Sequence, residues 1–151
     1  KLLIETGRSD DGRALLSNAL KFSTSEEREA NRLKVAEAYL ENDCFEEAEK
    51  LFVRALKHDP QSIETYNRLG IALRRQGKHK DAERYYNLAL SYHPNNPTIL
   101  YNIGVLHLDR QDKASAVKLF QRALQIDPEL EKAKEMLKRI AQQDENQSGS
   151  T

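Results

Sequence analysis

The chain has 151 residues, 38% of them hydrophobic and 32% charged, and its 24 Lys and Arg residues balance 24 Asp and Glu residues. This zero net charge argues against a nucleic-acid partner, and no apolar run reaches the roughly 20 residues that a membrane span needs. Cys44 is the only cysteine, so no disulfide can form within the chain, which fits a reducing compartment and predicts a cytoplasmic protein.

Residues 1–28 are expected to form a truncated helical hairpin followed by a linker. Gly7 stands where a hairpin turn would fall, and the chain begins at Lys1 rather than Met, so we expect a piece of a longer protein. Residues that match second-helix positions then follow: Gly12, Leu16, Ala19 and Leu20. Thr24, with Glu27 three residues on, predicts a capping box at the start of the next helix.

One short motif occurs three times at a constant interval. ALKHDP at residues 55–60 is followed by ALSYHP and ALQIDP, and each copy begins 34 residues after the one before, at residues 55, 89 and 123. Further positions recur in the same register: Ala48, Ala82 and Ala116; Phe52, Tyr86 and Phe120; Leu56, Leu90 and Leu124; Pro60, Pro94 and Pro128. The predicted repeat units are 29–62, 63–96 and 97–130, and such a period indicates stacked repeats.

Each unit contains two stretches with helical periodicity. In the middle unit, the first stretch places these residues on one face: Tyr66, Leu69, Gly70 and Leu73. Gly77 ends that helix, and Pro94 ends the second helix. The second stretch has its own apolar face: Ala82, Tyr85, Tyr86, Ala89 and Leu90. Asn96 before Pro97 is a typical helix start. Small residues are expected where helix axes come close together.

The last part of the chain is predicted to be a single helix followed by a tail. Residues 131–143 have helical periodicity with a charge-rich outer face, which suits a helix that caps the stack. Residues 144–151 are polar and have no apolar period, so they are expected to be disordered.

The repeated pattern closely resembles the tetratricopeptide repeat. The positions that carry the resemblance in the middle unit are Tyr66, Leu69, Gly70, Leu73, Ala82, Tyr86, Ala89 and Pro94. Leu73 and His107 depart from the family's usual Tyr, which Tyr39 retains, and Arg32 departs from its usual bulky residue. The resemblance covers 29–130. It implies an all-α protein, a right-handed α-solenoid of stacked helix-turn-helix hairpins with a C-terminal capping helix, over residues 1–143.

The sequence contains no arrangement typical of catalysis, a cofactor or a metal. Its four histidines fall in different units without metal-ligand spacing: His58, His79, His93 and His107. Cys44 has Asp43, Glu46 and Glu47 near it, and acidic neighbours raise rather than lower a thiol pKa. We therefore predict that the chain is not an enzyme and holds no cofactor or metal.

A concave surface lined by the first helix of each unit is the predicted binding site. The repeat packing leaves free the residues assigned to this peptide-binding groove: Lys34, Asn67, Arg68, Ile71, Arg74, Tyr101, Asn102 and Val105, with Lys132 and Arg139 as further candidates. Cations, amides and apolar side chains suit an extended peptide that carries an acidic group. The alternative interpretation is that Arg74 and Arg75 form a solvated helix end, and that Ile71 and Val105 pack against the neighbouring unit.

Two functions remain open on this basis. The first is a non-catalytic protein-protein interaction module that binds an extended segment of a partner, without nucleic-acid or membrane partners. The second is a structural spacer or self-association module of a larger, signalling protein. One tetratricopeptide subfamily binds chaperone C-termini through a clamp of lysines, asparagines and an arginine. Only Asn102 falls on an expected clamp position, while Asn67 and Ile71 stand where that clamp has Lys and Asn.

Overall fold

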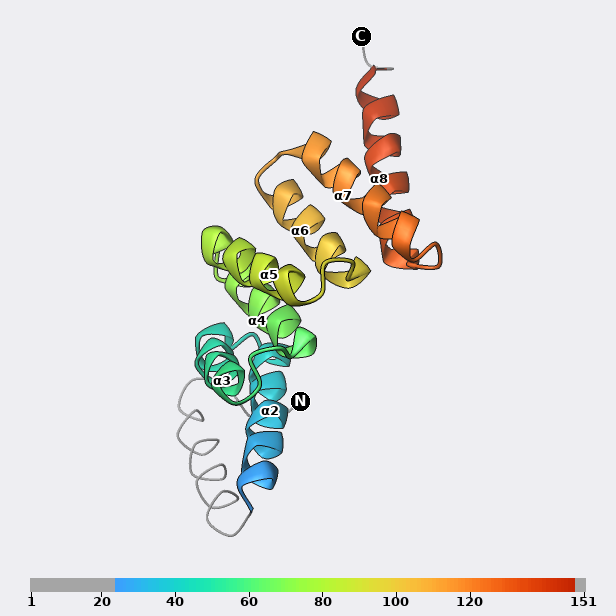
Figure 1. Ribbon diagram of the computed structural model, residues 1–151. Helices are drawn as coiled ribbons and strands as arrows, with labels where there is room; N and C mark the ends of the chain where they lie inside the picture. The colour runs from blue at the N-terminus through green and yellow to red at the C-terminus, as the bar shows by residue number, and fades with distance from the viewer. Residues whose placement is uncertain (1–23, 149–151) are drawn as a thin grey trace. The chain divides into compact units, whose positions relative to one another are not determined.

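The computed structural model describes residues 24–148, which form helices and contain no strand (Figure 1). The helices are α2 (Ser25–Glu41), α3 (Phe45–His58), α4 (Ile63–Arg75), α5 (His79–Tyr92), α6 (Pro97–Asp109), α7 (Lys113–Ile126) and α8 (Glu131–Ser148). The predicted all-α repeat class is confirmed. The chain divides into two compact units, unit 1 up to Ala82 and unit 2 from Glu83, and each is described by itself.

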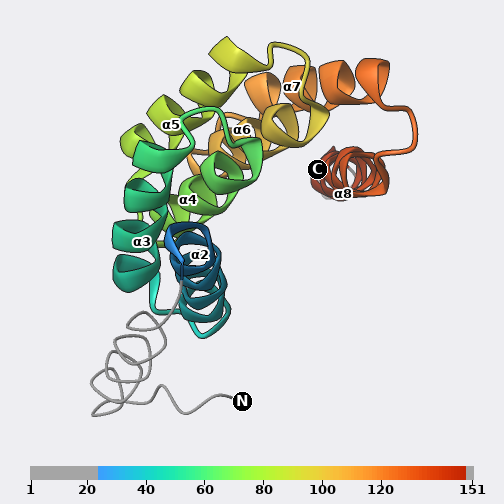
Figure 2. The same ribbon diagram turned by 60° about the horizontal axis from the view of Figure 1, so that its bottom comes forward.

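In unit 1, the helices α2, α3 and α4 of the described residues stack in the order of the chain. α3 packs against both α2 and α4, and α2 also contacts α4, as the two views show (Figures 1 and 2). Ala48 and Ala55 on α3 are buried on either side of the fully buried ring of Phe52. Small residues beside one large ring allow the neighbouring helix axes to come close together. The alternation of alanine and aromatic residues in the sequence therefore forms the core of this unit.

Unit 2 repeats that packing around a second aromatic ring. α7 packs against α6 and α8, and Ala116 and Phe120 of α7 form one core cluster with Ala133 and Ile140 of α8. Gly104 of α6 lies directly against the Phe120 ring, because a Cβ added at this glycine would lie 2.6 Å from Cε1 of that ring. The close contact between α6 and the Phe120 ring of α7 thus depends on a residue without a side chain.

The turn inside each hairpin has the same backbone conformation. Asp43, Gly77 and Gln111 occupy equivalent repeat positions and have φ of 61°, 75° and 62°. After α4, the N–H of Gly77 donates to the carbonyl of Arg74, and the N–H of Lys78 donates to that of Leu73, both at 2.9 Å. This pair of bonds is a Schellman motif, which normally places glycine at the left-handed residue. Gly77 was predicted to end its helix, whereas the other two turns use non-glycine residues in the same conformation.

Replacing Gln111 with glycine is expected to raise the free energy of unfolding by about 0.5–1 kcal/mol, because glycine adopts a positive φ without the steric cost of a Cβ. Urea unfolding followed by circular dichroism measures this difference. Gly77→Ala is the matched control and should destabilise the protein. A Gln111→Gly protein that unfolds at lower urea than the original would contradict the steric explanation.

A carboxylate on a second helix reaches the turn of the following hairpin in each unit. In unit 1, Oε2 of Glu49 accepts hydrogen bonds from Nε2 of Gln76 at 2.8 Å and from Nζ of Lys78 at 2.9 Å. In unit 2, Nη1 of Arg110 donates to Oε2 of Glu83 at 2.6 Å. Glu49 and Glu83 occupy the same repeat position, as do Gln76 and Arg110. These contacts, which we call turn braces, follow the repeat although the sequence pattern did not reveal them.

The Glu49→Gln variant is expected to lose about 0.5 kcal/mol of stability at neutral pH, because the brace is partly exposed and screened. Burial alone would raise the pKa of Glu49, but the hydrogen bonds from Lys78 and Gln76 outweigh it and hold that pKa below the ordinary value of 4.5. The stabilisation is therefore present above pH 4.5 and is lost as the pH falls through the folded-state pKa. Denaturant titrations across that window measure it. A stability difference that stays constant with pH would contradict this assignment.

The first helix begins earlier than the repeat register alone predicts. The capping box is confirmed, since the N–H of Glu27 donates to Oγ1 of Thr24 at 3.2 Å and the N–H of Thr24 donates to Oε2 of Glu27 at 2.8 Å. Residues 25–28, predicted as linker, are therefore the first turn of α2. The rest of the predicted truncated repeat, residues 1–23, lies outside the described residues.

The last helix is longer than predicted. The sequence placed the end of the capping helix at residue 143 and a disordered tail after it, but α8 continues to Ser148. The prediction was wrong for residues 144–148. Nζ of Lys113 on α7 pairs with Oδ1 of Asp144, so a charged contact supports a segment that has no apolar period. Residues 149–151 lie outside the described range. None of the described helices is both long enough and apolar enough to cross a membrane.

Candidate interaction surface

The first helices of unit 1 share one surface that contains five of the predicted site residues. Lys34 on α2 is exposed, while four residues of α4 are half-buried and spaced along one side of that helix: Asn67, Arg68, Ile71 and Arg74. The guanidinium of Arg68 lies 3.8 Å from a carboxylate oxygen of Glu37 on α2. That contact places Arg68 of α4 beside Glu37 of α2.

Carboxylates moderate the positive charge of this surface. Besides Glu37, the guanidinium of Arg68 lies 3.8 Å from Oε1 of Glu64, and that of Arg75 lies 4.0 Å from Oδ1 of Asp43. Such long, partly exposed ion pairs contribute little stability. The Arg68 guanidinium can therefore leave Glu37 or Glu64 and pair with a carboxylate of a ligand at little cost in free energy. The sequence identified the cations but not their carboxylate partners. The pair with Glu64 is a spacing of four residues within α4, whereas the pair with Glu37 depends on how α2 and α4 pack together.

The predicted site residues of unit 2 lie where α6 meets the core of that unit. Tyr101 and Val105 are half-buried and pack against the cluster formed by α7 and α8. The rings of Tyr101 and Phe120 are 5.4 Å apart between centroids and tilted by 41°. Asn102 is half-buried on the same helix. Tyr101 and Val105 therefore contribute to packing and also retain partly exposed surface.

Lys132 on α8, a further candidate for the binding site, lies against the ring of Tyr101. Its ammonium nitrogen is 4.7 Å from the centroid of the Tyr101 ring, a cation–π contact. Burial lowers the pKa of Lys132, and no carboxylate pairs with it within residues 24–148. A partly desolvated cation that faces an aromatic ring is a suitable contact for an anionic ligand group. Arg139, the other candidate, is exposed and directs Nη1 to Sδ of Met136 at 3.8 Å.

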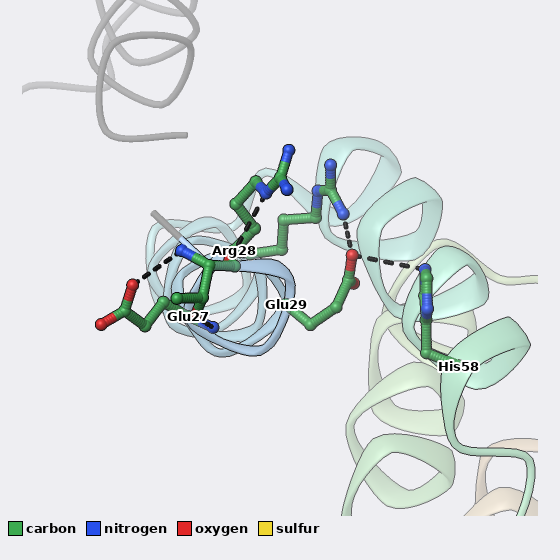
Figure 3. Close-up of polar contacts among 6 residues, drawn as sticks. Glu27, Arg28, Glu29 and His58 are labelled. Atoms are coloured by element: carbon green, nitrogen blue, oxygen red, sulfur yellow. Dashed lines mark hydrogen bonds and ion pairs between the residues drawn. The ribbon is translucent and has the colours of Figure 1, made fainter. Parts of the chain in front are cut away.

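The residues with catalytic or metal-binding potential make structural contacts. Nε2 of His58 lies 3.3 Å from Oε1 of Glu29, an oxygen that Arg32 also contacts, so that α2 and α3 are joined (Figure 3). Nδ1 of His107 lies 3.0 Å from Oδ2 of Asp112, the N-cap residue of α7.

The lone thiol is kept protonated by its surroundings. Burial, followed by the charges of Glu47 and Asp43, raises the pKa of the Cys44 thiol, which disfavours the nucleophilic thiolate. The described part of the chain contains no group of three or more His, Cys, Asp or Glu side chains that could hold a metal.

Helical hairpins with a constant 34-residue register define the class of α-helical repeat proteins. A family model described as the Tetratricopeptide repeat protein 21 C-terminal ARM domain matches residues 8–142. The chain therefore belongs to this family of tetratricopeptide-repeat proteins, and the resemblance inferred from the sequence is confirmed.

Known proteins resemble the chain over most of its length. Tetratricopeptide repeat protein 21A of Homo sapiens is 25% identical over 115 residues, 76% of this chain and 9% of that protein. Protein O-mannosyl-transferase TMTC3 of Homo sapiens is 30% identical over 100 residues, 66% of this chain and 10% of that protein. The chain spans about a tenth of the length of these curated relatives.

A solved structure supports the fold. The first TPR of Spaghetti (RPAP3), bound to the HSP90 peptide SRMEEVD, is 20% identical and has a TM-score of 0.68. The alignment covers 80% of this chain and 96% of that one. At this level of identity the likeness establishes the helical-repeat fold. It does not establish which ligand this chain binds.

Proposed function

We propose that the chain is a non-catalytic protein-interaction module whose first helices bind an extended segment of a partner protein. The observation that carries the proposal is the Arg68–Glu37 contact, because it joins the α2 and α4 sides of a surface left free by repeat packing. Arg68 and Asn67 can bind carboxylate and backbone groups, and Ile71 offers a half-buried apolar contact. The peptide-bound RPAP3 domain supports a peptide ligand for this fold.

An acidic group in the ligand is the second part of the proposal. Lys34 in unit 1 and Lys132 in unit 2 are cations without a carboxylate partner in the described range, and burial disfavours the charged form of Lys132. An acidic side chain that contacts either ammonium gains an ion pair without first breaking one in the protein. In unit 2, Asn102 and the exposed part of Tyr101 would hold the adjoining peptide backbone.

The proposal places this module in the cytoplasm as part of a larger protein. Cys44 is a free cysteine, which is compatible with a reducing compartment. Imaging of the tagged full-length protein tests this location, and a signal confined to a secretory compartment would contradict it. The structural-spacer alternative predicts self-association of the chain, which analytical ultracentrifugation distinguishes by a sedimentation coefficient that rises with concentration.

Selection from a random peptide library against the immobilised chain tests the proposed function directly. Selected peptides should share an acidic residue near an apolar one, and they should bind the original chain better than a variant with altered first-helix residues. A selection that yields no peptide, or peptides indifferent to first-helix substitutions, would overturn the proposal. The decisive variant is Arg68→Glu.

A further inference from the structure

Each second helix carries a line of exposed residues, and of these His58 alone was described above as joining its helix to a neighbouring one. Within each second helix, three exposed positions stand four residues apart, and we call these the ridge residues. They are Lys50, Arg54 and His58 on α3; Arg84, Leu88 and Tyr92 on α5; Lys118, Arg122 and Ile126 on α7. No acidic residue occupies a ridge position of α5 or α7, whereas on α3 the exposed Glu46 stands four residues before Lys50 and continues that line. An ordinary solvated helix face usually mixes both signs of charge.

The ridge of α7 has the least internal charge compensation. The helix sequence KASAVKLFQRALQI contains no acidic residue, and neither Lys118 nor Arg122 pairs with a carboxylate among residues 24–148. Residues four apart on a helix lie about 6 Å from each other on its surface. Ile126 continues the line and has 38% of its surface exposed. The α7 ridge therefore offers two uncompensated cations followed by an apolar contact.

The α5 ridge of the same unit has a related composition. It begins with Arg84, whose guanidinium lies 5.0 Å from the ring centroid of Tyr85, and continues with Leu88 and Tyr92. Leu88 and Tyr92 are 41% and 43% exposed. With Ile126, they are the large hydrophobic residues that the described part of the chain exposes, and all of them occupy ridge positions in unit 2. Exposed apolar residues beside uncompensated cations indicate a contact surface.

We propose that the α7 ridge of unit 2 forms a second docking surface, for an acidic amphipathic helix of a partner protein. Lys118 and Arg122 are spaced to pair with two carboxylates that are likewise four residues apart on the partner helix. Ile126 then receives one of its apolar side chains. This surface lies on a second helix and is separate from the first-helix residues that are proposed to bind an extended peptide.

The chemistry of the ridges favours a protein partner over a polyanion or a bilayer. Strong nucleic-acid binding rests on roughly 6–10 phosphate contacts, and basic membrane-binding segments use clusters of about 4–8 cations. The unit 2 ridges supply Arg84, Lys118 and Arg122 in a chain of zero net charge. Few cations combined with aliphatic and aromatic contacts match the composition of protein interfaces, where Arg and Tyr are enriched.

Fluorescence anisotropy with a labelled synthetic peptide tests this surface on the intact chain. The probe is an amphipathic helix with glutamates four residues apart beside a leucine face. The double variant Lys118→Glu with Arg122→Glu is expected to weaken its binding about tenfold or more at low salt, and Ile126→Ser by a smaller factor. Lys57→Glu with Lys138→Glu makes the same charge change at exposed positions outside the lines of ridge residues and should leave the affinity unchanged.

Three results would overturn this docking surface. One is equal binding by the original and the Lys118→Glu, Arg122→Glu chains, with far-ultraviolet circular dichroism showing that both are folded. Another is loss of peptide binding in the Lys34→Glu variant instead, which would place the binding site of the peptide on the first helices. The third is ridge-dependent binding of an RNA homopolymer or of phosphatidylserine-containing vesicles in place of the peptide.

Discussion

Gly104→Ala is expected to lower the free energy of unfolding by about 2 kcal/mol, although alanine ordinarily stabilises a helix interior by about 1 kcal/mol relative to glycine. An added Cβ would lie 2.6 Å from Cε1 and 2.9 Å from Cδ1 of Phe120. That ring is fully buried and also contacts Tyr101, so it cannot move aside without disturbing the α6–α7–α8 core. Urea unfolding monitored by circular dichroism measures the loss.

A double-mutant cycle separates this steric effect from other causes. Phe120→Leu removes the ring atoms that the new Cβ would meet, so the double variant should lose less stability than the two single variants added together. If the two losses of stability simply add, the effect of Gly104→Ala does not come from a clash with the Phe120 ring. A Gly104→Ala chain that is more stable than the original would mean that helix propensity decides the outcome at this position.

Arg68→Glu is expected to weaken the binding of library-selected acidic peptides about tenfold or more, which corresponds to about 1.4 kcal/mol. The substitution puts a third carboxylate beside Glu37 and Glu64, which both lie 3.8 Å from the Arg68 guanidinium. An acidic ligand group that contacts position 68 would then meet three carboxylates in place of a guanidinium. Isothermal titration calorimetry with one selected peptide measures the change.

Matched variants make the Arg68 result specific to the first helices. Arg68→Gln removes the charge without reversing it and should give a smaller loss. Lys34→Glu alters an exposed cation on α2 and should also weaken binding. Arg54→Glu makes the same charge reversal on the second helix of unit 1, and it should leave the affinity of the selected peptide unchanged. If Arg54→Glu and Arg68→Glu weaken binding equally, the effect is a general one of net charge and the first-helix site is wrong.

The sequence predicted the repeat core well, because burial there depends on spacing within one helix. Phe52, Tyr86 and Phe120 recur in a fixed register and are all buried with their flanking alanines. The left-handed turns were found only at Gly77, because Asp43 and Gln111 have side chains that do not identify such a conformation. Likewise the end of α8 was placed too early, since Asp144 is held by Lys113 of another helix rather than by an apolar period.

The candidate surface was less predictable than the core because its properties depend on pairs of helices. Repeat positions assigned Lys34 and Arg68 to one surface, but the contact of Arg68 with Glu37 depends on how α2 and α4 pack together. The contact of Lys132 with Tyr101 similarly joins α8 to α6. Both contacts join two helices, so the pattern of a single helix identifies Arg68 and Lys132 as candidates but does not show that Glu37 and Tyr101 contact them.

The turn braces have a consequence for how the protein opens. Since Glu49 binds Gln76 and Lys78, and Glu83 binds Arg110, the fraying of one second helix releases the turn of the hairpin that follows it. Neighbouring hairpins in each unit are thus coupled in their local unfolding, as expected when stability comes from nearest-neighbour interfaces. Amide hydrogen exchange should then speed up at the α4 turn when Glu49 is replaced, even though the backbone of that turn is unaltered.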